Sequence, residues 1–146
     1  MKFFTAAVAA LALASSASAA FSSCGSSSDE FHLTGVTYTP SPPKVNQDVC
    51  ITVKGTLATP VAQGATIRVT ATFLGIQVYD QTADLCAGLA NSTTPCPIAT
   101  TVNSVTNCIT VPSNVPTGIS LTLKAVAKNA DANQLFCISG PLSFVA

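Results

Sequence analysis

Few side chains in this chain of 146 residues could support acid–base or nucleophilic chemistry. His32 is the only histidine, so a Ser-His-Asp triad would have to use it as its base. The sequence has no G-x-S-x-G motif, the pattern that presents a nucleophilic serine on a sharp turn. We therefore interpret His32, which lies between Phe31 and Leu33, as a structural or surface residue of a strand.

Two other kinds of reactive site also fit the sequence poorly. Asp80 and Asp84 could be proposed as a pair of glycosidase carboxylates. The chain has few polar aromatic residues that could bind a sugar, so we expect these two aspartates to be solvated loop acids. A single histidine and cysteines committed to disulfides leave no set of metal ligands. We therefore predict no catalytic centre, no metal site and no cofactor, and we do not expect an enzyme.

Charge is sparse and balanced in the whole chain. Six lysines and arginines match six aspartates and glutamates, and charged residues make up 8% of the sequence. Such a surface has no positive field for nucleic acid and no lysine-rich patch for strong capture by anionic membranes. Lys54, Arg68, Lys124 and Lys128 fall on the polar side of predicted strands and are expected on a solvated face, with contact to a lipid headgroup or membrane as the alternative.

The N-terminal residues have the pattern of a secretory signal peptide. The apolar run from Phe3 to Ala14 is shorter than the roughly 20 residues that span a bilayer. Ala17-Ser18-Ala19 fits the A-x-A cleavage pattern. We expect residues 1–19 to be removed and residues 20–146 to form one domain with its own core; an uncleaved anchor is the alternative. The protein is thus expected to be secreted, or to lie in a vacuolar or lysosomal lumen.

All six cysteines follow this segment, which indicates three disulfides formed in an oxidising compartment. One expected pair, Cys86–Cys96, brackets a short loop rich in Gly, Asn, Ser and Thr. A second, Cys50–Cys108, joins outward positions on two strands, which a disulfide can bridge if the strands are antiparallel neighbours. The remaining pair, Cys24–Cys137, would tie the N-terminal arm to the last hairpin. The loop of the local pair contains the sequon Asn91-Ser92-Thr93, so we expect glycosylation at Asn91.

Short alternating runs of apolar and polar residues, separated by Pro, Gly and Asn, predict strands with almost no helix. About seven antiparallel strands at this spacing, without an internal repeat, indicate an all-β fold, an immunoglobulin-like β-sandwich. The tryptophan that marks antibody domains is absent. The expected strands are 31–39, 48–56, 66–74, 76–79, 104–111, 120–128 and 134–144.

The positions expected to face the interior carry mainly small and aliphatic side chains. With few bulky aromatic residues between the sheets, such a sandwich could hold an apolar cavity on the usual scale of roughly 300–1,000 Å³. Composition alone favours a solid core and leaves the cavity as the alternative. The inward positions are Val49, Ile51, Val53, Leu57, Ile67, Val69, Ala71, Phe73, Ile109, Val111, Leu121, Leu123, Ala125 and Ala127.

An ordered series of short motifs extends over nearly the whole chain after the signal segment. It runs through Cys24-Gly25, Pro42-Pro43-Lys44, Cys50-Ile51-Thr52-Val53, Phe73-Leu74-Gly75, Asp84-Leu85-Cys86, Cys96-Pro97-Ile98, Val111-Pro112-Ser113, Val115-Pro116-Thr117-Gly118 and Leu135-Phe136-Cys137. This series resembles the ML (lipid-recognition) domain family, with its Niemann–Pick type C sterol-transfer and fungal phosphatidylglycerol/phosphatidylinositol transfer branches. The fungal secreted branch is the more similar.

The resemblance implies a sandwich whose sheets separate to hold the apolar part of a lipid. It implies a sterol or phospholipid ligand, transient contact with membranes and a monomer. It also supports the pairs Cys24–Cys137 and Cys86–Cys96, whereas Cys50–Cys108 depends on the strand argument alone. The alternative function is a non-enzymatic recognition or structural module with a solid, disulfide-linked core.

Within this family layout we expect lipid to enter beside the middle of the chain. Plain core packing is the alternative for each residue, and the hydroxyl of Tyr79 could meet a polar lipid head. The expected mouth is Phe73, Ile76, Val78 and Tyr79; the rim is Leu85, Pro97 and Ile98; the facing loop supplies Val111, Val115 and Pro116; and Leu121 and Leu123 line the interior.

Overall fold

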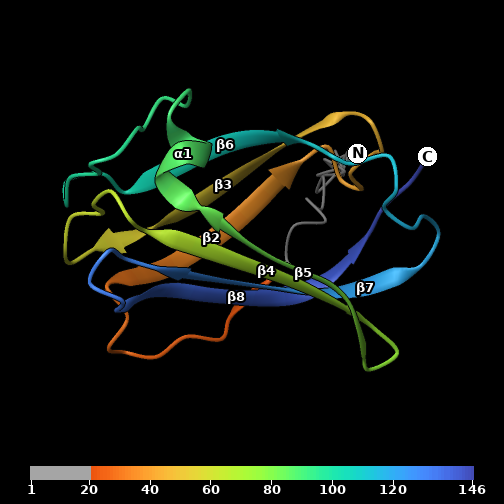
Figure 1. Cartoon of the computed structure of the whole chain (residues 1–146), viewed down its shortest axis with the longest axis horizontal. Coiled ribbons are helices and arrows are strands. Elements are labelled where there is room, and N and C mark those ends of the chain that lie inside the picture. The colour runs from red at the N-terminus through yellow and green to blue at the C-terminus, as the bar shows by residue number, and fades with distance from the viewer. Residues whose placement is uncertain (1–20) are drawn as a thin grey trace, which may run out of the picture.

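The computed structural model describes residues 21–146, and the signal peptide expected at residues 1–19 lies outside them (Figure 1). The described strands form two antiparallel sheets, one of five strands in the order β1-β8-β7-β4-β5 and one of three in the order β2-β3-β6. The expected all-β sandwich is therefore confirmed. The elements are β1 (Ser22–Ser23), β2 (Phe31–Thr39), β3 (Asp48–Leu57), β4 (Thr66–Phe73), β5 (Ile76–Asp84), α1 (Leu85–Leu89), β6 (Ser104–Thr110), β7 (Ser120–Lys128) and β8 (Gln134–Ser143).

The structure corrects the sequence predictions around β5. This strand continues to Asp84 instead of ending at Tyr79, and all nine of its residues are exposed. An exposed edge strand does not need the apolar alternation that reveals a half-buried strand, so its second half resembled a loop. Asp80 is accordingly a strand residue, and Asp84 caps α1 by accepting a hydrogen bond from the Ala87 backbone N–H at 2.9 Å.

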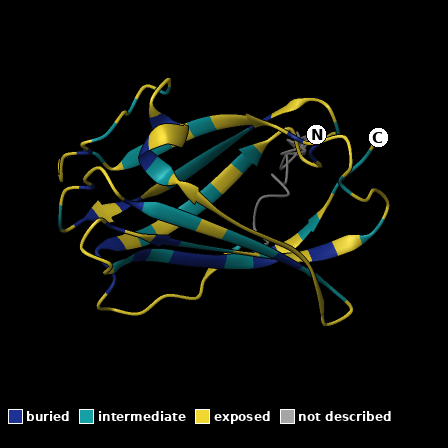
Figure 2. Ribbon diagram, viewed as in Figure 1, coloured by how far each residue is buried: buried dark blue, intermediate teal, exposed yellow. Residues whose placement is uncertain are grey.

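The closed hydrophobic core lies at the α1 end of the sandwich. Figure 2 shows buried positions around α1 and along β8. Leu135, 2% exposed, packs in a cluster with residues from four strands, α1 and the loops beside it. Its buried members are Phe31, Leu57, Val61, Ala65, Cys86, Leu89, Ile98, Ala127 and Leu135.

A buried polar network holds the start of β2 against the β7–β8 hairpin. Asn129, 4% exposed, donates through Nδ2 to Glu30 Oε2 at 2.8 Å and to the Pro60 carbonyl at 2.9 Å. Its Oδ1 accepts from the Ala62 backbone N–H at 3.1 Å. Asn133 Nδ2 also donates to Glu30, at 3.3 Å. This network supplies partners for polar groups that would be costly to bury alone.

Replacing Asn129 with alanine is expected to lower the free energy of unfolding by about 2–3 kcal/mol, because a buried carboxylate loses its best donor. Asn133→Ala, at an exposed position with the longer bond to Glu30, is the matched control and should cost less. Urea denaturation followed by circular dichroism measures both. Equal losses for the two variants would contradict the assigned role of Asn129.

The structure contains the three disulfides Cys24–Cys137, Cys50–Cys108 and Cys86–Cys96, which are the pairs expected from the sequence. Cys50 and Cys108 are directly paired residues of β3 and β6, on the face that also carries the Thr52–Thr106 hydroxyl hydrogen bond of 2.8 Å. The outward placement inferred from strand alternation is therefore confirmed.

Candidate functional site

The strand register defines the side chains that point into the space between the sheets, which we call the intersheet space. On the three-stranded sheet, Ile51 of β3 shares its face with Asn107 of β6, and on the other sheet Val69 of β4 shares its face with Ala125 of β7. Several apolar members of these rows remain half-buried, including Ile51, Val69 and Leu123. In a close-packed sandwich such central positions would be buried. These three positions of the intersheet space are therefore partly accessible to solvent, whereas Val49, Ala71 and Leu121 on the same two faces are buried.

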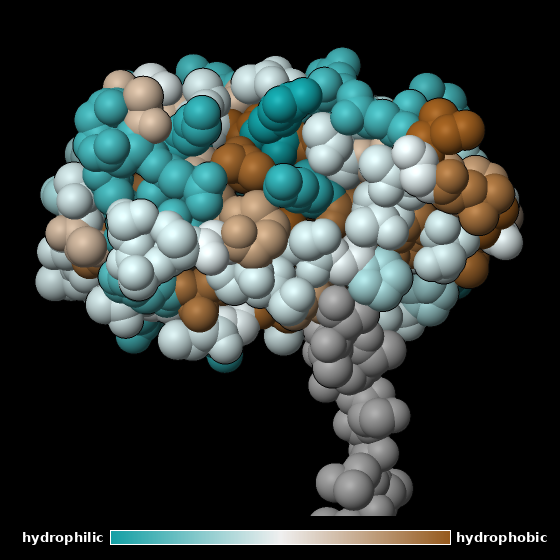
Figure 3. All heavy atoms as spheres, turned by 90° about the horizontal axis from the view of Figure 1, so that it is seen from below, coloured by the Kyte–Doolittle hydropathy of each residue, from teal (hydrophilic) through white to brown (hydrophobic). Residues whose placement is uncertain are grey.

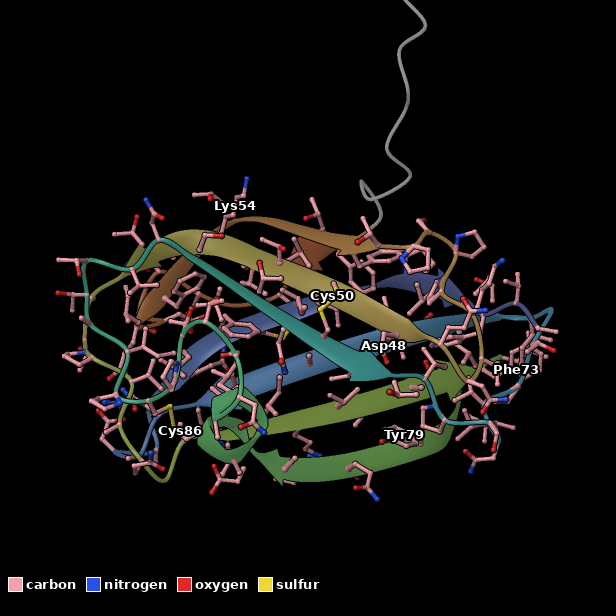
Figure 4. The ribbon with its side chains drawn as sticks, turned by 90° about the horizontal axis from the view of Figure 1, so that it is seen from above. Asp48, Cys50, Lys54, Phe73, Tyr79 and Cys86 are labelled. Atoms are coloured by element: carbon pink, nitrogen blue, oxygen red, sulfur yellow. A yellow bond between two sulfur atoms is a disulfide. The ribbon has the colours of Figure 1, made fainter. Side chains whose placement is uncertain are left out.

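One side of this space is bordered by the edge strands β5 and β6. In Figure 1, β6 runs along the top and β5 along the front, with α1 following β5 at one end, and Figure 4 shows Phe73 and Tyr79 away from Cys86 along this side. We call this border the lateral opening. The exposed large apolar side chains of the described chain all belong to its two strands or to the turn before β5: Leu74 (85% exposed), Ile76 (69%), Val78 (51%), Tyr79 (48%) and Ile109 (50%).

The β4–β5 hairpin presents an apolar tip to solvent. Leu74 and Gly75 form its two-residue turn with positive φ angles of 51° and 80°. Glycine adopts this region without cost, whereas a branched side chain rarely does. The Leu74 side chain is exposed at this turn, and Figure 3 shows hydrophobic residues at the end of the molecule where this hairpin lies. An apolar tip of this kind marks a surface that interacts with something other than water.

The structure brings the four residues of the expected mouth together along this hairpin. Phe73, half-buried, is directly paired with Ile76, and Tyr79 is paired with buried Ala71. Both pairs are on the face that points into the intersheet space. Val78 lies at a register irregularity between these pairs. Their role as the entrance for a lipid stays a prediction.

Other residues of the expected site lie elsewhere. Ile98, 5% exposed, belongs to the closed core and is joined to Val61 by two backbone hydrogen bonds of 2.9 and 3.0 Å. Leu85 packs against the same core, and Pro97 is exposed beside it. These three residues therefore belong to the closed α1 end and not to the rim of the lateral opening.

The expected facing loop and interior residues are also divided. Val111 and Leu121 are each 3% exposed and are part of the buried interior. Val115 is half-buried and Pro116 exposed, in the loop between β6 and β7. Leu123 is half-buried in the inward row of β7. Only Leu123 of this group borders the accessible part of the intersheet space.

Sequence reasoning missed Leu74 and Ile109 as exposed residues, because their patterns were those of strand and core residues. It also missed two polar residues that face inward from the edge strands. Gln81 is paired with Val69, and Asn107 with Ile51, so both amides share the faces of inward apolar residues. Alternation along β5 could have identified Gln81 only if the strand had been extended past Tyr79.

Two shallow hollows lie outside the lateral opening. One, of about 260 Å³, is on the outer face of the five-stranded sheet and is lined by Arg68, Thr70, Gln77, Lys124 and Val126. The other, of about 350 Å³, lies where the ends of β2 and β8 meet, and its lining includes Tyr38, Pro42 and Leu142. Neither contains a pair of groups arranged for acid–base catalysis.

An ion pair spans β4 and β5 beside the first hollow. Arg68 donates to both carboxylate oxygens of Asp80, at 2.9 and 2.7 Å. Its hydrogen bonds lower the pKa of Asp80, and Asp80 raises the pKa of Arg68. Because both groups are well exposed, solvent screens the pair and its contribution to stability is small.

The described residues contain no group of three or more His, Cys, Asp and Glu side chains that could hold a metal ion. His32 is exposed on β2, as expected for a surface residue. In the same part of the chain, no helix has the length and hydrophobicity needed to cross a membrane. The lateral opening, which carries the exposed large apolar side chains of the described chain, is the candidate functional site, with apolar contact as its chemistry.

Two fungal proteins of the same name are similar in sequence. The phosphatidylglycerol/phosphatidylinositol transfer protein of Candida albicans is 31% identical over 113 residues, which cover 77% of this chain and 58% of that protein. The Kluyveromyces lactis protein of that name is 31% identical over 122 residues, covering 82% of this chain and 70% of that protein. The chain thus spans about three-fifths to two-thirds of the length of these relatives.

Two crystal structures share the fold. A Niemann-Pick type C2 protein from Japanese carpenter ant aligns with a TM-score of 0.66 at 17% identity, covering 85% of this chain and 98% of that chain. Chicken MD-1 complexed with lipid IVa aligns with a TM-score of 0.56 at 16% identity, covering 84% and 87%. The ML domain family model matches residues 18–144. This match, which covers nearly the whole chain, shows that the chain belongs to the ML domain family.

Proposed function

We propose that this protein binds one lipid with its apolar part between the two sheets and transfers it between membranes. The observation that carries the proposal is the group of five exposed large apolar side chains on β5, β6 and the turn before β5. They border an intersheet space in which several inward residues are only half-buried. Each methylene removed from water gains about 0.8 kcal/mol. Loading and unloading require this gain to be similar to the gain in a membrane. The process requires an apolar, water-poor space and no acid or base, so the function is non-enzymatic.

The names of the relatives support a lipid as the ligand. The fungal relatives are named as phosphatidylglycerol/phosphatidylinositol transfer proteins, and the chicken MD-1 structure contains lipid IVa. For this chain we propose a sterol or a phospholipid, held by a monomer through Phe73, Ile76, Val78 and Tyr79 at the lateral opening, with Leu123 lining the space behind them.

We also propose a secreted or lumenal location, with residues 1–19 as a removed signal peptide and residues 20–146 as the mature domain. Three disulfides support an oxidising compartment. Asn91 is exposed in the loop that the Cys86–Cys96 bond closes, so it would be accessible to glycosylation. A glycosylated protein would have a higher mass than its sequence gives. We expect this extra mass to be removed by a glycosidase and to be absent in Asn91→Gln.

The function is tested by extracting the purified protein and identifying bound lipid by mass spectrometry. In parallel, the delipidated protein is offered a fluorescent sterol and a fluorescent phospholipid. We expect at least one lipid to co-purify or to load at about one molecule per protein. Absence of both would overturn the proposal and favour a disulfide-linked recognition or structural module.

Replacing Leu74 and Ile76 together with serine is expected to slow lipid transfer between vesicles about tenfold, because the apolar hairpin tip can no longer enter the membrane surface. Since both side chains are exposed, the unfolding midpoint should change little. Gln77→Ser, in the same hairpin, is the control. A vesicle-to-vesicle fluorescence assay gives the rate, and an unchanged rate in the double variant would contradict membrane contact through this tip.

A further inference from the structure

The inward rows of the sandwich carry no charge. The register from β2 to β8 places apolar residues, glycine and two tyrosines on the interior faces, with two amide side chains as the other polar groups. These are Gln81 on β5 and Asn107 on β6, and both belong to strands that border the lateral opening. Apart from the Tyr38 hydroxyl on β2, the polar groups of the inward rows thus lie on the two strands that border the lateral opening.

Each amide ends an apolar row that crosses one sheet. On the five-stranded sheet the row runs from Gln81 through Val69 and Ala125 to Ile138. On the three-stranded sheet, Asn107 is followed by Ile51 and then Tyr38. A lipid lying across the first row would have its apolar body over aliphatic side chains, and across the second row over Ile51 and the ring of Tyr38, with its polar end at an amide in both cases.

Both amides are free to bind a ligand. Within residues 21–146, neither Gln81 nor Asn107 makes a side-chain hydrogen bond to the protein, whereas the buried amide of Asn129 uses both its oxygen and its nitrogen. Gln81 is exposed and Asn107 half-buried, so a ligand at the lateral opening can reach them. Each amide offers a donor and an acceptor.

The two border strands have no positive charge. β5 carries Asp80 and Asp84, and β6 carries no charged residue. The only guanidinium next to β5, that of Arg68, is on the outer face and bonded to Asp80. An anionic phosphate at the lateral opening would therefore find no inward cation on these strands, and removing a charge from water without a partner is costly.

We propose that the lateral opening selects a lipid whose polar end is an uncharged hydroxyl, and that Gln81 and Asn107 bind this hydroxyl. The inference rests on the proposed lipid-binding function and specifies its ligand class. A hydroxyl both donates and accepts, which matches the free amides, and it leaves no charge to be neutralised. A sterol, a diacylglycerol or a fatty alcohol has such an end, whereas phosphatidylglycerol carries an anionic phosphate.

The test uses two pairs of ligands, and the two members of each pair share one apolar body and differ in the polar end. The delipidated protein is titrated with a fluorescent sterol and then with the unlabelled sterol, the sterol sulfate, diacylglycerol and phosphatidylglycerol as competitors. We expect the sterol to compete at least about tenfold better than its sulfate, and diacylglycerol better than phosphatidylglycerol. If the sterol competes and diacylglycerol does not, the hydroxyl lipid that the protein selects is a sterol.

Matched variants then test the two amides. Gln81→Leu and Asn107→Leu keep side-chain size and should each weaken sterol binding by about 3- to 10-fold, the effect of one lost hydrogen bond. Thr82→Val and Ser104→Ala change outward positions of the same strands and should leave binding unchanged. Gln81→Lys should reverse the preference toward sterol sulfate and phosphatidylglycerol.

The possible failures can be told apart. If no lipid loads, the proposed function fails. If lipid loads but the sulfate or phosphatidylglycerol competes as well as its uncharged counterpart, the head selectivity is wrong while lipid binding stands. If selectivity is present but both leucine variants bind as the unmodified protein does, the two amides are not the groups that select it.

Discussion

The Ala125→Phe variant is expected to lose lipid loading by more than about tenfold while the protein remains folded. Ala125 lies in the middle of the apolar row between Val69 and Ile138, on the interior face of the five-stranded sheet. It is half-buried, unlike Ala127 two residues later, which is fully buried in the core. A phenyl ring at this position would occupy the volume that we propose for the lipid.

The same substitution measures whether the intersheet space is open. Adding a large side chain to a close-packed core costs about 1–3 kcal/mol, because neighbours must shift. In an open space the ring should change the free energy of unfolding by less than about 1 kcal/mol. Urea denaturation and sterol titration on one protein sample therefore separate loss of folding from loss of binding.

Val126→Phe is the matched control for this experiment. Val126 is the next residue of β7 and lines the hollow on the outer face of the sheet. It receives the same ring on the same strand without entering the intersheet space, so its loading should equal that of the unmodified protein. Normal loading by Ala125→Phe, with stability unchanged, would place the ligand elsewhere.

The second large effect is expected from removing the bond between Cys24 and Cys137, whose residues are 113 apart in sequence. In the chain-entropy model, a closed loop of this length contributes about 5 kcal/mol to stability. The bond ties the segment before β2 to β8, where the Cys24 backbone N–H also donates to the Cys137 carbonyl at 2.9 Å. Replacing both cysteines with alanine should therefore destabilise the whole domain.

The local Cys86–Cys96 bond provides the comparison, since its residues are only 10 apart. The same model gives about 3 kcal/mol for its loop, so the corresponding double alanine variant should retain more stability. Thermal denaturation of the two variants and the unmodified protein ranks them directly. A larger loss in Cys86→Ala/Cys96→Ala would show that loop closure is not the main contribution of these bonds.

The sequence was most informative where one face of a strand is buried. The alternation around Val49, Ile51 and Val53 predicted β3, and the polar position of Cys50 within it led to its partner Cys108. The sequence was least informative along β5, where exposure of both faces removes the alternation after Tyr79. Gln81 was missed for this reason, because its side chain could not be assigned to a face of the sheet without a predicted strand at that position.

Residues of the same type differ in burial because of the tertiary structure. Ile98, which the sequence placed at a rim, is 5% exposed, whereas Ile109, which the sequence placed in the interior, is 50% exposed. Ile98 is paired with Val61 beneath α1, whereas Ile109 lies on a sheet edge without a neighbouring strand beyond it. Burial of such side chains depends on which elements cover them, and short-range sequence patterns do not record this.

The sequence by itself determined the all-β fold, the pairing of the cysteines and the scarcity of charge. These follow from local alternation, cysteine position and composition, which act over a few residues or over the chain as a whole. Only the tertiary structure decided that the main core cluster lies at the α1 end and that, among the described residues, β5, β6 and the turn before β5 carry the exposed large apolar side chains. That division depends on how two sheets are covered and where their edges remain free, which is set by contacts between residues far apart in sequence.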